Sequence, residues 1–431
     1  MKKVTTALIG AGQRGMHCYA PFALRNPHKL KFIAVAEPDP VKREQFRLAH
    51  GISPQNCFTT GEELLEKPQL ADAVLVCTQD RFHYKPTLRA LEQGYHVLVE
   101  KPMSTDPLEC IVMEEYAQKY DRKLMVGHVL RYTSFFTAIK ELLTEGAIGD
   151  LVTIQHNENV GYWHMAHSYV RGNWRNSTES SPMILAKSCH DLDILLWLAG
   201  ADCHKLSSFG SLTHFKQEHA PVGAPLRCTD GCPVEKDCAF YAPRLYLTED
   251  TGWPASVISK DTSLEGRTRA LQEGPYGRCV YHCDNNVVDH QVVSIEFANQ
   301  VTAAFTMSAF TNEISRTIKL MGTQGELRGA MEKNEIEITH FATGQRKVIH
   351  LQESPYGHSG GDDGIMRDFV ELIGQEGNGN ERLTALTMAS TSVQSHMMAF
   401  AAEESRLAGR MIELPTYMQQ RKSSLASIIG R

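Results

Sequence analysis

The stretch Val4-Thr5-Thr6-Ala7-Leu8-Ile9-Gly10-Ala11-Gly12-Gln13-Arg14-Gly15 decides the fold class. Its first six residues are mostly apolar, which predicts a short buried strand that ends at a glycine cluster. A helical pattern follows from Met16 to about Leu24, and a second strand pattern covers Leu30–Ala36. A strand, a tight glycine turn and a helix in this order are typical of the first unit of a dinucleotide-binding fold.

The glycine turn has the spacing Gly-x-Gly-x-x-Gly. Gly10 permits the turn, Gly12 lets the backbone approach a pyrophosphate, and Gly15 allows the helix to pack closely on the strand. The start of the helix, with Gln13 and Arg14, offers free N–H groups and a partial positive charge to phosphates. The turn therefore predicts a dinucleotide site. A glycine turn in an α/β protein that binds no nucleotide is the alternative.

An acidic residue closes the second predicted strand. Glu37 lies 22 residues beyond Gly15, where a carboxylate can accept hydrogen bonds from both hydroxyls of an adenosine ribose. A carboxylate there repels the additional phosphate of NADP, so NAD is the favoured cofactor. Arg14 and Lys42 could neutralise such a phosphate and weaken this preference.

Strand and helix patterns continue to alternate along the first third of the chain. Predicted strands at Ala73–Cys77, His96–Val99 and Lys123–Gly127 alternate with predicted helices at Val41–His50, His83–Gln93 and Pro107–Tyr120. This alternation predicts a doubly wound parallel sheet, with ligands beyond the carboxyl ends of its strands. The polar residues near those ends are the other candidates for cofactor binding: Thr78, Gln79, His83, Glu100, Lys101 and His128.

The tripeptide Glu100-Lys101-Pro102 stands at a predicted strand end, about 90 residues after the glycine turn. Together with Gly-Ala-Ile-Gly-Asp at 146–150 and Met-Gly-Thr-Gln-Gly-Glu-Leu at 321–327, it makes the chain resemble the glucose–fructose oxidoreductase, inositol dehydrogenase and rhizopine catabolism (Gfo/Idh/MocA) family. The resemblance implies an α/β protein with an N-terminal Rossmann domain over 1–130. A C-terminal α/β domain with a large, mostly antiparallel open sheet would cover 131–431. It also implies that Lys101 hydrogen-bonds substrate and nicotinamide ribose.

A second motif of that family, Asp-x-x-x-His followed by Asp, is matched by the segment from Ala186 to Asp193. His190 falls on the catalytic histidine, which implies a role as general acid and base. The family's aspartate is replaced by Ala186, and Lys187 is an alternative catalytic group beside it. The chemistry can therefore differ from plain alcohol oxidation. We interpret Asp191 and Asp193 as helix-start carboxylates that the helix dipole favours.

An aromatic and basic segment at 161–175 has no clean period, which predicts a loop or a short irregular helix. Its aromatic faces could stack on sugar rings while its basic groups bond hydroxyls. A surface loop anchored by buried tryptophans is the alternative, and Arg171 with Arg175 could instead meet a carboxylate or phosphate. The substrate-binding candidates in this segment are Trp163, His164, His167, Tyr169, Arg171 and Trp174.

Further substrate-binding candidates lie elsewhere in the chain. Arg131 and Tyr132 follow the predicted strand end at His128, and His290 precedes a predicted strand at Val292–Phe297. His358 lies on a glycine loop that opens a predicted helix, where Asp362 is first of all an N-cap.

Five of the eleven cysteines fall within 56 residues, in a proline- and glycine-rich stretch over about 212–286. This stretch resembles an insertion within the second domain. Thiolates gathered in such a loop predict a structural, tetrahedral Zn²⁺. An iron–sulfur cluster and free thiols are the alternatives. The expected ligands are Cys228, Cys232, Cys238 and Cys279, with Cys283 as the replacement for one of them.

Composition places the 431-residue chain among ordinary globular proteins, with 42% apolar and 22% charged residues. Its net charge of −6 argues against nucleic acid as a partner. The sequence shows no apolar run long enough to cross a bilayer and no secretory leader, so we expect a cytoplasmic protein. The resemblance implies a homodimer or a homotetramer.

These observations predict an NAD-dependent oxidoreductase for a sugar or glycoside ring hydroxyl, with C3 as the expected position. In this hypothesis Lys101 orients the hydroxyl, His190 removes its proton, and hydride passes to the nicotinamide. The alternative is a redox-neutral NAD-dependent glycosidase that works through a 3-keto intermediate. A non-catalytic NAD-binding sensor is the third hypothesis.

Overall fold

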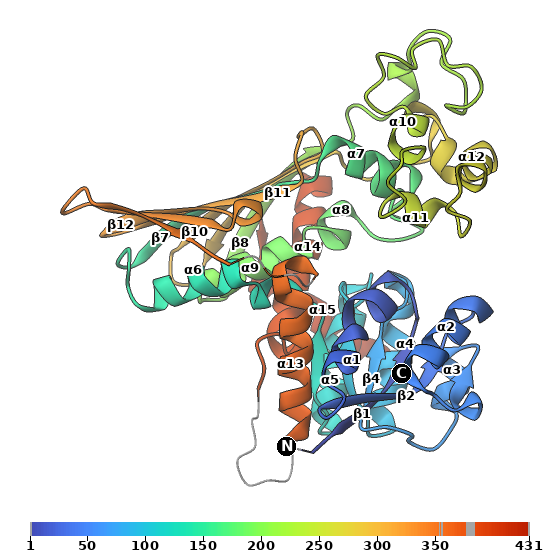
Figure 1. Ribbon diagram of the computed structural model, residues 1–431. Helices are drawn as coiled ribbons and strands as arrows, with labels where there is room; N and C mark the ends of the chain where they lie inside the picture. The colour runs from blue at the N-terminus through green and yellow to red at the C-terminus, as the bar shows by residue number, and fades with distance from the viewer. Residues whose placement is uncertain (1, 353, 355–356, 376–383, 430–431) are drawn as a thin grey trace.

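Two β-sheets organise the protein, one in each half of the molecule (Figure 1). The computed structural model describes residues 2–352, 354, 357–375 and 384–429. A parallel six-stranded sheet lies in the N-terminal half, and a mostly antiparallel nine-stranded sheet lies in the C-terminal half. The predicted α/β fold class, a Rossmann sheet followed by a large open sheet, is confirmed.

The N-terminal sheet has the strand order β3-β2-β1-β4-β5-β6, and all its pairs are parallel. The order reverses between β1 and β4, and this switch point is where doubly wound sheets bind their ligands. The strands are β1 (Val4–Ile9), β2 (Leu30–Ala36), β3 (Cys57–Phe58), β4 (Ala73–Val76), β5 (His96–Val99) and β6 (Leu124–Val126).

The helix after the glycine turn differs from the predicted Met16–Leu24. A π-helix begins at Gln13 and ends at Tyr19, and a separate α-helix begins at Pro21, whose missing N–H suits only a first helical turn. Helices α2 (Pro40–His50), α4 (Tyr84–Glu92) and α5 (Pro107–Lys119) follow the predicted patterns. The structure adds the short helix α3 (Gly61–Leu65), which was not predicted, to α1 (Pro21–Arg25).

The C-terminal sheet has the order β14-β13-β12-β11-β7-β10-β9-β8-β15, in which only the β10–β7 pair is parallel within the described residues. Alternate residues of β11 are buried, so one face of the sheet is covered and the other is open. The strands are β7 (Leu151–Asn159), β8 (Cys203–Ser211), β9 (His290–Phe297), β10 (Thr302–Ser308), β11 (Ser315–Gly322), β12 (Gly325–Ala330), β13 (Glu335–His340), β14 (Arg346–His350) and β15 (Ile412–Glu413).

Helices α6, α9 and α14 pack against this sheet, while α10, α11 and α12 stand apart at one end of it (Figure 1). These three belong to the stretch between β8 and β9, which has a small apolar core of its own around Tyr246 and Leu271. We call residues 212–289 the insertion. The helices are α6 (Ser134–Thr144), α7 (Tyr162–His164), α8 (Met183–Ala186), α9 (Cys189–Ala199), α10 (Ala242–Tyr246), α11 (Ala255–Ile258), α12 (Leu264–Glu273), α13 (Gly361–Gly374), α14 (Ala389–Ala408) and α15 (Leu414–Ile429).

The two halves interlock because late segments of the chain return to the first sheet. Apolar residues of α13, among them Ile365 and Phe369, share a core with Leu8 of β1. The backbone N–H of Val126 in β6 donates to the carbonyl of Thr387 at 2.9 Å. The carboxyl ends of the parallel strands therefore face the second half of the molecule.

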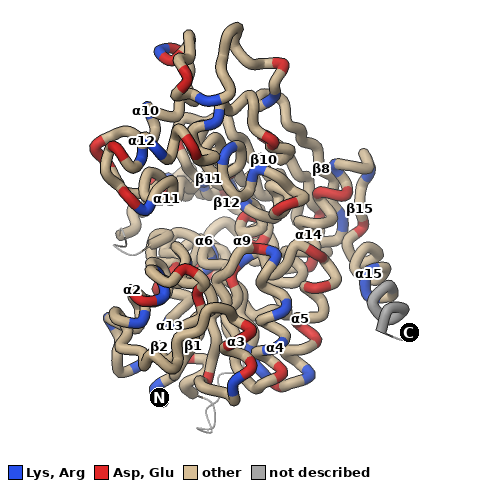
Figure 2. The backbone as a smooth tube through the Cα atoms, turned by 90° about the vertical axis from the view of Figure 1, so that its right-hand side faces the viewer, with Lys and Arg blue, Asp and Glu red and all other residues tan. Residues whose placement is uncertain are grey.

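In Figure 2, positions of Lys and Arg (blue) and of Asp and Glu (red) are interspersed along the backbone of both halves. Within the part of the chain that the structure describes, no helix is long and apolar enough to span a membrane.

A buried ion pair joins the two halves at Arg131. Its Nε and Nη2 donate to Asp193 of α9 at 2.7 and 2.8 Å, and both side chains are buried. Asp193 is therefore more than the helix-start carboxylate that the sequence suggests. Burial acts to raise its pKa, but the charge and hydrogen bonds of Arg131, together with the neighbouring His128, lower it.

Replacing Arg131 by Met should lower the free energy of unfolding by about 3–5 kcal/mol, because Asp193 then stays buried without its partner. Denaturant titration measures this loss. The control is Arg269→Met, which removes an exposed pair with Glu265 and should cost less than about 0.5 kcal/mol. Equal losses of unfolding free energy for the two substitutions would show that the Arg131–Asp193 pair is not a stabilising buried ion pair.

Candidate active site

The glycine turn has the geometry of a nucleotide cradle. Gly10 has a φ of +94°, and a Cβ atom there would lie 2.6 Å from the carbonyl oxygen of Cys77. A Cβ at Gly15 would lie 2.4 Å from the Gly10 oxygen, whereas a Cβ at Gly12 would meet nothing within 4 Å. The backbone is therefore closely packed on its inner side and open at Gly12, as the approach of a pyrophosphate requires. The residues present fit NAD.

Glu37 lies beside this cradle at the end of β2. Its carboxylate accepts from the Ala11 N–H at 2.7 Å and from the Asp39 N–H at 3.0 Å. Exposed Gln13 stands at the start of the π-helix. The acid and the helix start are thus both at the rim of the glycine turn, where the sequence predicts them.

Arg14 does not point freely toward a phosphate. Its Nε donates to Glu100 at 2.6 Å and its Nη2 donates to Asp362 of α13 at 2.8 Å. The Nδ1 atom of His358 lies 3.1 Å from Arg14 Nη1 and 3.0 Å from an Asp362 oxygen. Burial acts to raise the pKa of Asp362, but the His358 hydrogen bond and the Arg14 charge hold it well below its usual range. This network fixes Glu100 and brings His358 to the glycine turn.

Other cofactor candidates lie at the end of β4. Thr78 is half-buried and Gln79 is exposed. The ring nitrogens of His83 lie 2.7 Å from the Pro102 carbonyl and 3.0 Å from the Thr78 carbonyl. His83 therefore positions the ends of β4 and β5 relative to each other.

Lys101 and His190 converge between the two halves. Lys101 follows β5, and its Nζ donates to the carbonyl of Ala186 at the end of α8, at 2.9 Å. His190 is in the first turn of α9, and its Nδ1 is buried without a hydrogen-bond partner among the described atoms. Burial, and next the charge of Lys101, hold the pKa of His190 well below 6.5. The imidazole is therefore neutral at physiological pH and able to accept a proton.

His128, a cofactor candidate at the end of β6, is fully buried beside this pair. Its ring centroid lies 5.6 Å from that of His190 and 5.2 Å from that of His396. Burial lowers the pKa of His128 to about 4. His128, His190 and His396 thus form a cluster of buried imidazoles whose pKa values are lowered, first by burial and in part by the charge of Lys101.

Lys187 pairs with a carboxylate that the sequence analysis missed. Its Nζ lies 3.0 Å from Glu158 of β7, which is fully buried. Arg316, which faces Glu158 across the β7–β11 pair, also bonds Glu158 and lies 2.9 Å from Asp191. Asp191 accepts from His156 at 2.8 Å and is therefore a buried network member, not a simple helix-start carboxylate.

The aromatic segment folds as α7 followed by a π-helix over Met165–Arg171, in agreement with the predicted irregular helix. His164 has a pKa well below 6.5, first because of burial and then because of the charge of Lys187, so its ring lies near the catalytic candidates. Tyr169 is buried, and its ring centroid lies 6.2 Å from that of Trp174. The Nε1 of Trp174 donates to Asp80 at 3.3 Å.

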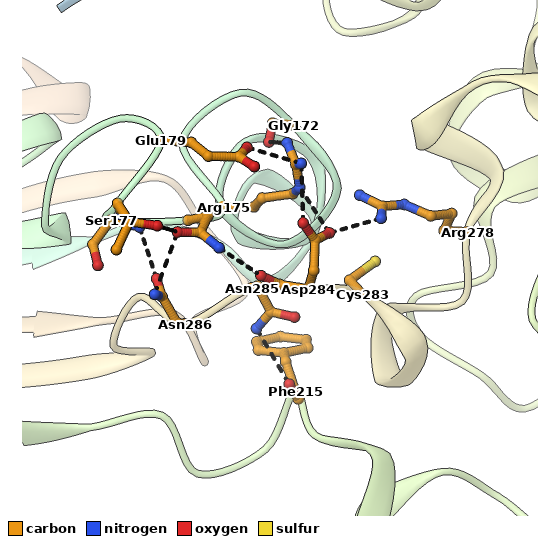
Figure 3. Close-up of polar contacts among 12 residues, drawn as sticks. Gly172, Arg175, Ser177, Glu179, Phe215, Arg278, Cys283, Asp284, Asn285 and Asn286 are labelled. Carbon is orange, nitrogen blue, oxygen red and sulfur yellow. Dashed lines mark hydrogen bonds and ion pairs between the residues drawn. The ribbon is translucent and has the colours of Figure 1, made fainter. Parts of the chain in front are cut away.

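Two candidates of this segment face the insertion instead. Nδ1 of His167 lies 2.8 Å from the Tyr246 hydroxyl. Arg171 donates to the carbonyls of Arg278 and Phe240, at 2.7 Å each. Figure 3 shows how the next residues are tied to the end of the insertion, where Arg175 and Arg278 both bond Asp284 at 2.8 and 2.7 Å.

The remaining substrate candidates bond to other protein groups. Arg131 pairs with Asp193, and the Tyr132 hydroxyl donates to Asp368 at 2.6 Å. Nδ1 of His290 lies 2.8 Å from Asp289, whose carboxylate also accepts the backbone N–H groups of residues 213 and 214. These contacts hold segments of the fold together.

The predicted zinc site is not supported. Among the described residues, no group of three or more His, Cys, Asp or Glu side chains is arranged to hold a metal ion. The expected ligands lie in one stretch of the sequence: Cys228, Cys232, Cys238, Cys279 and Cys283. Two of their sulfurs make hydrogen bonds to other groups, since Cys283 donates to the Cys279 carbonyl and Cys228 accepts from Arg171. Burial raises the pKa of Cys279 to about 11, which keeps it a thiol.

Comparisons with known proteins agree with this geometry. The family profile described as "Oxidoreductase family, NAD-binding Rossmann fold" matches residues 4–128, and "Oxidoreductase family, C-terminal alpha/beta domain" matches residues 140–414. A Bacillus subtilis protein named as an oxidoreductase, YteT, is 23% identical over 319 residues, which are 69% of this chain and 72% of that protein.

Two further relatives carry more specific names. The 2,7-anhydro-N-acetylneuraminate hydratase of Mediterraneibacter gnavus is 26% identical over 57% of this chain, which spans 65% of that protein, just under two thirds. The solved structure of scyllo-inositol dehydrogenase from Lactobacillus casei, with bound NAD(H) and scyllo-inositol, has a TM-score of 0.65 at 16% identity and covers 96% of this chain and 100% of its own. That likeness shows a shared fold.

The buried imidazoles make stability depend on pH. Because the folded-state pKa of His128 is about 4, the unfolded chain binds more protons than the folded protein below pH 6.5. Stability is therefore lost as the pH falls. Between about pH 7.5 and about pH 5 the free energy of unfolding should therefore fall, and we expect His128→Leu to make this fall smaller by roughly 2 kcal/mol. Denaturant titrations at both pH values measure it. His204→Leu, at an exposed position, is the control, and equal losses in both variants would contradict the expectation.

Proposed function

The chain belongs to the Gfo/Idh/MocA oxidoreductase family, and we propose that it is an NAD-dependent enzyme that oxidises a ring hydroxyl of a sugar or glycoside, at C3. The observation that carries the proposal is the convergence of an ammonium and a neutral imidazole, Lys101 and His190, at the carboxyl edge of the parallel sheet. A proton acceptor beside a fixed positive charge suits the deprotonation of an alcohol.

The cofactor side of the proposal rests on the glycine turn and its neighbours. NAD, when bound, supplies the two-electron oxidant. Gly12 and the first N–H groups of the π-helix would hold its pyrophosphate, and Glu37 would accept from its adenosine ribose. Gln79 and Thr78 lie at the next strand end, at the same edge of the sheet.

The protein's own part in the reaction is positioning and proton transfer. The Lys101 ammonium, held by the Ala186 carbonyl, donates to the substrate hydroxyl oxygen and stabilises the negative charge that develops there. His190 accepts the hydroxyl proton, since its lowered pKa keeps it neutral. Lys187, fixed by Glu158, holds a second positive charge close to His164 and acts on substrate polar groups.

The substrate class is supported by the names of relatives. One solved structure of the same fold is a scyllo-inositol dehydrogenase, and one relative is named as a hydratase of an anhydro-sugar acid. Both names describe ring compounds with several hydroxyls. The open face of the nine-stranded sheet, where Phe209 and Val292 are exposed, supports association into two or four copies.

A redox-neutral glycosidase is the second candidate. It is favoured by Ala186, which stands where the family motif has an aspartate beside the catalytic histidine. Without that carboxylate, Lys187 is the nearest polar group along the chain. A nitrophenyl glycoside distinguishes the candidates, because the glycosidase releases nitrophenol without net NADH and loses this activity when NAD is removed. Net NADH without nitrophenol supports the oxidoreductase.

Gly12→Ala should fold normally and lose NAD affinity by at least about tenfold, because its Cβ meets no protein atom but occupies the open side of the turn. Gly15→Ala should instead destabilise the protein by about 1–3 kcal/mol, since its Cβ would overlap the Gly10 oxygen. Calorimetric titration with NAD and thermal melting measure the two effects. Unchanged NAD affinity in Gly12→Ala would contradict the assignment of the cofactor site.

Lys101→Met and His190→Asn should each reduce kcat by at least about a hundredfold, because each removes a group in contact with the reacting hydroxyl. NADH absorbance with a panel of sugars, inositols and sugar acids measures the rate. The matched control is Lys140→Met, because Lys140 also donates to a backbone carbonyl, that of Trp197 at 2.8 Å, but away from the crevice. Full activity in Lys101→Met would exclude the proposed mechanism.

A further inference from the structure

A pocket of about 340 Å³ lies between the insertion and the segment that carries α7. Its walls come from α7, the π-helix and the chain around α10 and α11, rather than from Lys101 or His190. In Figure 1 these elements gather at the end of the large sheet that carries the insertion. A pocket of this size accommodates a single sugar ring.

The pocket has aromatic walls. Trp163 of α7 and Trp253 of the insertion lie with ring centroids 5.3 Å apart at an angle of 57°, and Phe240 and Tyr241 line the pocket with them. Trp253 is 43% exposed, so its face is available to a ligand. Rigid aromatic faces suit the C–H face of a pyranose ring. The polar side chains of Arg244, Thr248 and Asp250 also line the pocket and can bond its hydroxyls.

A buried positive charge forms part of the same wall. Arg171 lines the pocket but is only 1% exposed. Its Nε and Nη2 donate to backbone carbonyls, whereas its Nη1 is buried without a hydrogen-bond partner among the described atoms. In the described part of the chain, no carboxylate lies within ion-pair distance of Arg171. Burying a guanidinium without a counter-ion lowers the stability of a protein, and a bound anion that pairs with it removes this penalty.

The cysteines near Arg171 do not supply that anion. Cys228 accepts from Arg171 Nη2 at 3.7 Å, which is a weak contact. The other printed hydrogen bonds of Arg171 go to uncharged backbone carbonyls, those of Arg278 and Phe240. The charge of Arg171 is therefore left for a ligand.

The pocket adjoins the catalytic candidates through α7. Trp163 lines the pocket. The pKa of its neighbour His164 is lowered, first by burial and then by the charge of Lys187. The His164 ring also lies 5.1 Å from Trp253. One short helix, α7, thus carries a residue that lines the pocket and a residue that is affected by the charge of Lys187.

We propose that this pocket binds an acidic sugar unit, whose ring stacks on Trp163 and Trp253 and whose carboxylate pairs with Arg171. The inference rests on the proposed function and names its substrate class: a glycoside in which the unit next to the reacting sugar carries a carboxylate. The insertion, which supplies Trp253 and Phe240, is then the part of the chain that selects the substrate.

Binding of three probes to the full-length protein tests the proposal without NAD and without turnover. Methyl glucuronide should bind at least about tenfold more tightly than methyl glucoside, as measured by calorimetry and tryptophan fluorescence. Trp253→Ala should weaken glucuronide binding at least about tenfold, whereas Phe341→Ala, at an exposed aromatic far along the chain, should leave it within about twofold. Arg171→Gln should abolish the preference for the acid. Because Arg171 is buried, Trp253→Ala keeps the test valid if Arg171→Gln does not fold.

The following results would overturn the proposed acidic-sugar site or separate it from the proposed oxidoreductase function. Equal affinity for the two glycosides, or no effect of Trp253→Ala, would overturn the proposal. Benzoate that binds as tightly as glucuronide would overturn the assignment to sugars and identify a site for aromatic acids. Sugar-dependent NADH formation without any preference for acids refutes this inference and leaves the proposed function intact. Tight glucuronide binding without any oxidation refutes the proposed function alone.

Discussion

The ammonium of Lys101 reaches from the end of a strand in the first sheet to the Ala186 carbonyl, which belongs to the half that carries the second sheet. This contact fixes the place where the two halves can act together. Pro102, held through its carbonyl by His83, continues the chain from Lys101. The chain that ends α8 then turns at once into α9, so His190 is brought to the same place. The candidate active site around Lys101 and His190 depends on this alignment of the two halves.

The surroundings of the crevice keep charges paired and imidazoles neutral. Glu158 and Asp191 are fully buried, and Lys187 and Arg316 compensate them. With these carboxylates paired, burial and the free charge of Lys101 decide the protonation of His190. A neutral imidazole affected by the charge of Lys101 follows from the packing around His190.

Much of the fold could be predicted from the sequence because glycine spacing and strand patterns are local. Val4–Ile9 and Leu30–Ala36 are strands with the predicted bounds. The meeting of Lys101 and His190 was implied by the family resemblance, since no local pattern places residues so far apart in sequence together. Glu158 and His156 were missed, although both share the buried face of β7 with Ile154, and a carboxylate on that face was a usable signal.

The cysteine prediction failed for a related reason. Closeness in sequence was taken as a sign of a metal site, but among the described residues no three His, Cys, Asp or Glu side chains are arranged to hold a metal ion, and the Cys283 thiol donates to the Cys279 carbonyl. Asp193 was likewise judged by its place in a helix, although its partner, Arg131, lies 62 residues earlier, in the segment that follows β6. Long-range partners of polar residues are what a single sequence hides.

The most direct test of the central claim is a crystal structure of the protein with NAD and a non-reacting sugar or inositol. The account predicts a nicotinamide at the carboxyl edge of β4 and β5, with one ligand hydroxyl within about 3.2 Å of both Lys101 Nζ and a His190 ring nitrogen. A ligand hydroxyl that contacts neither group, or a dinucleotide bound away from the glycine turn, would contradict it.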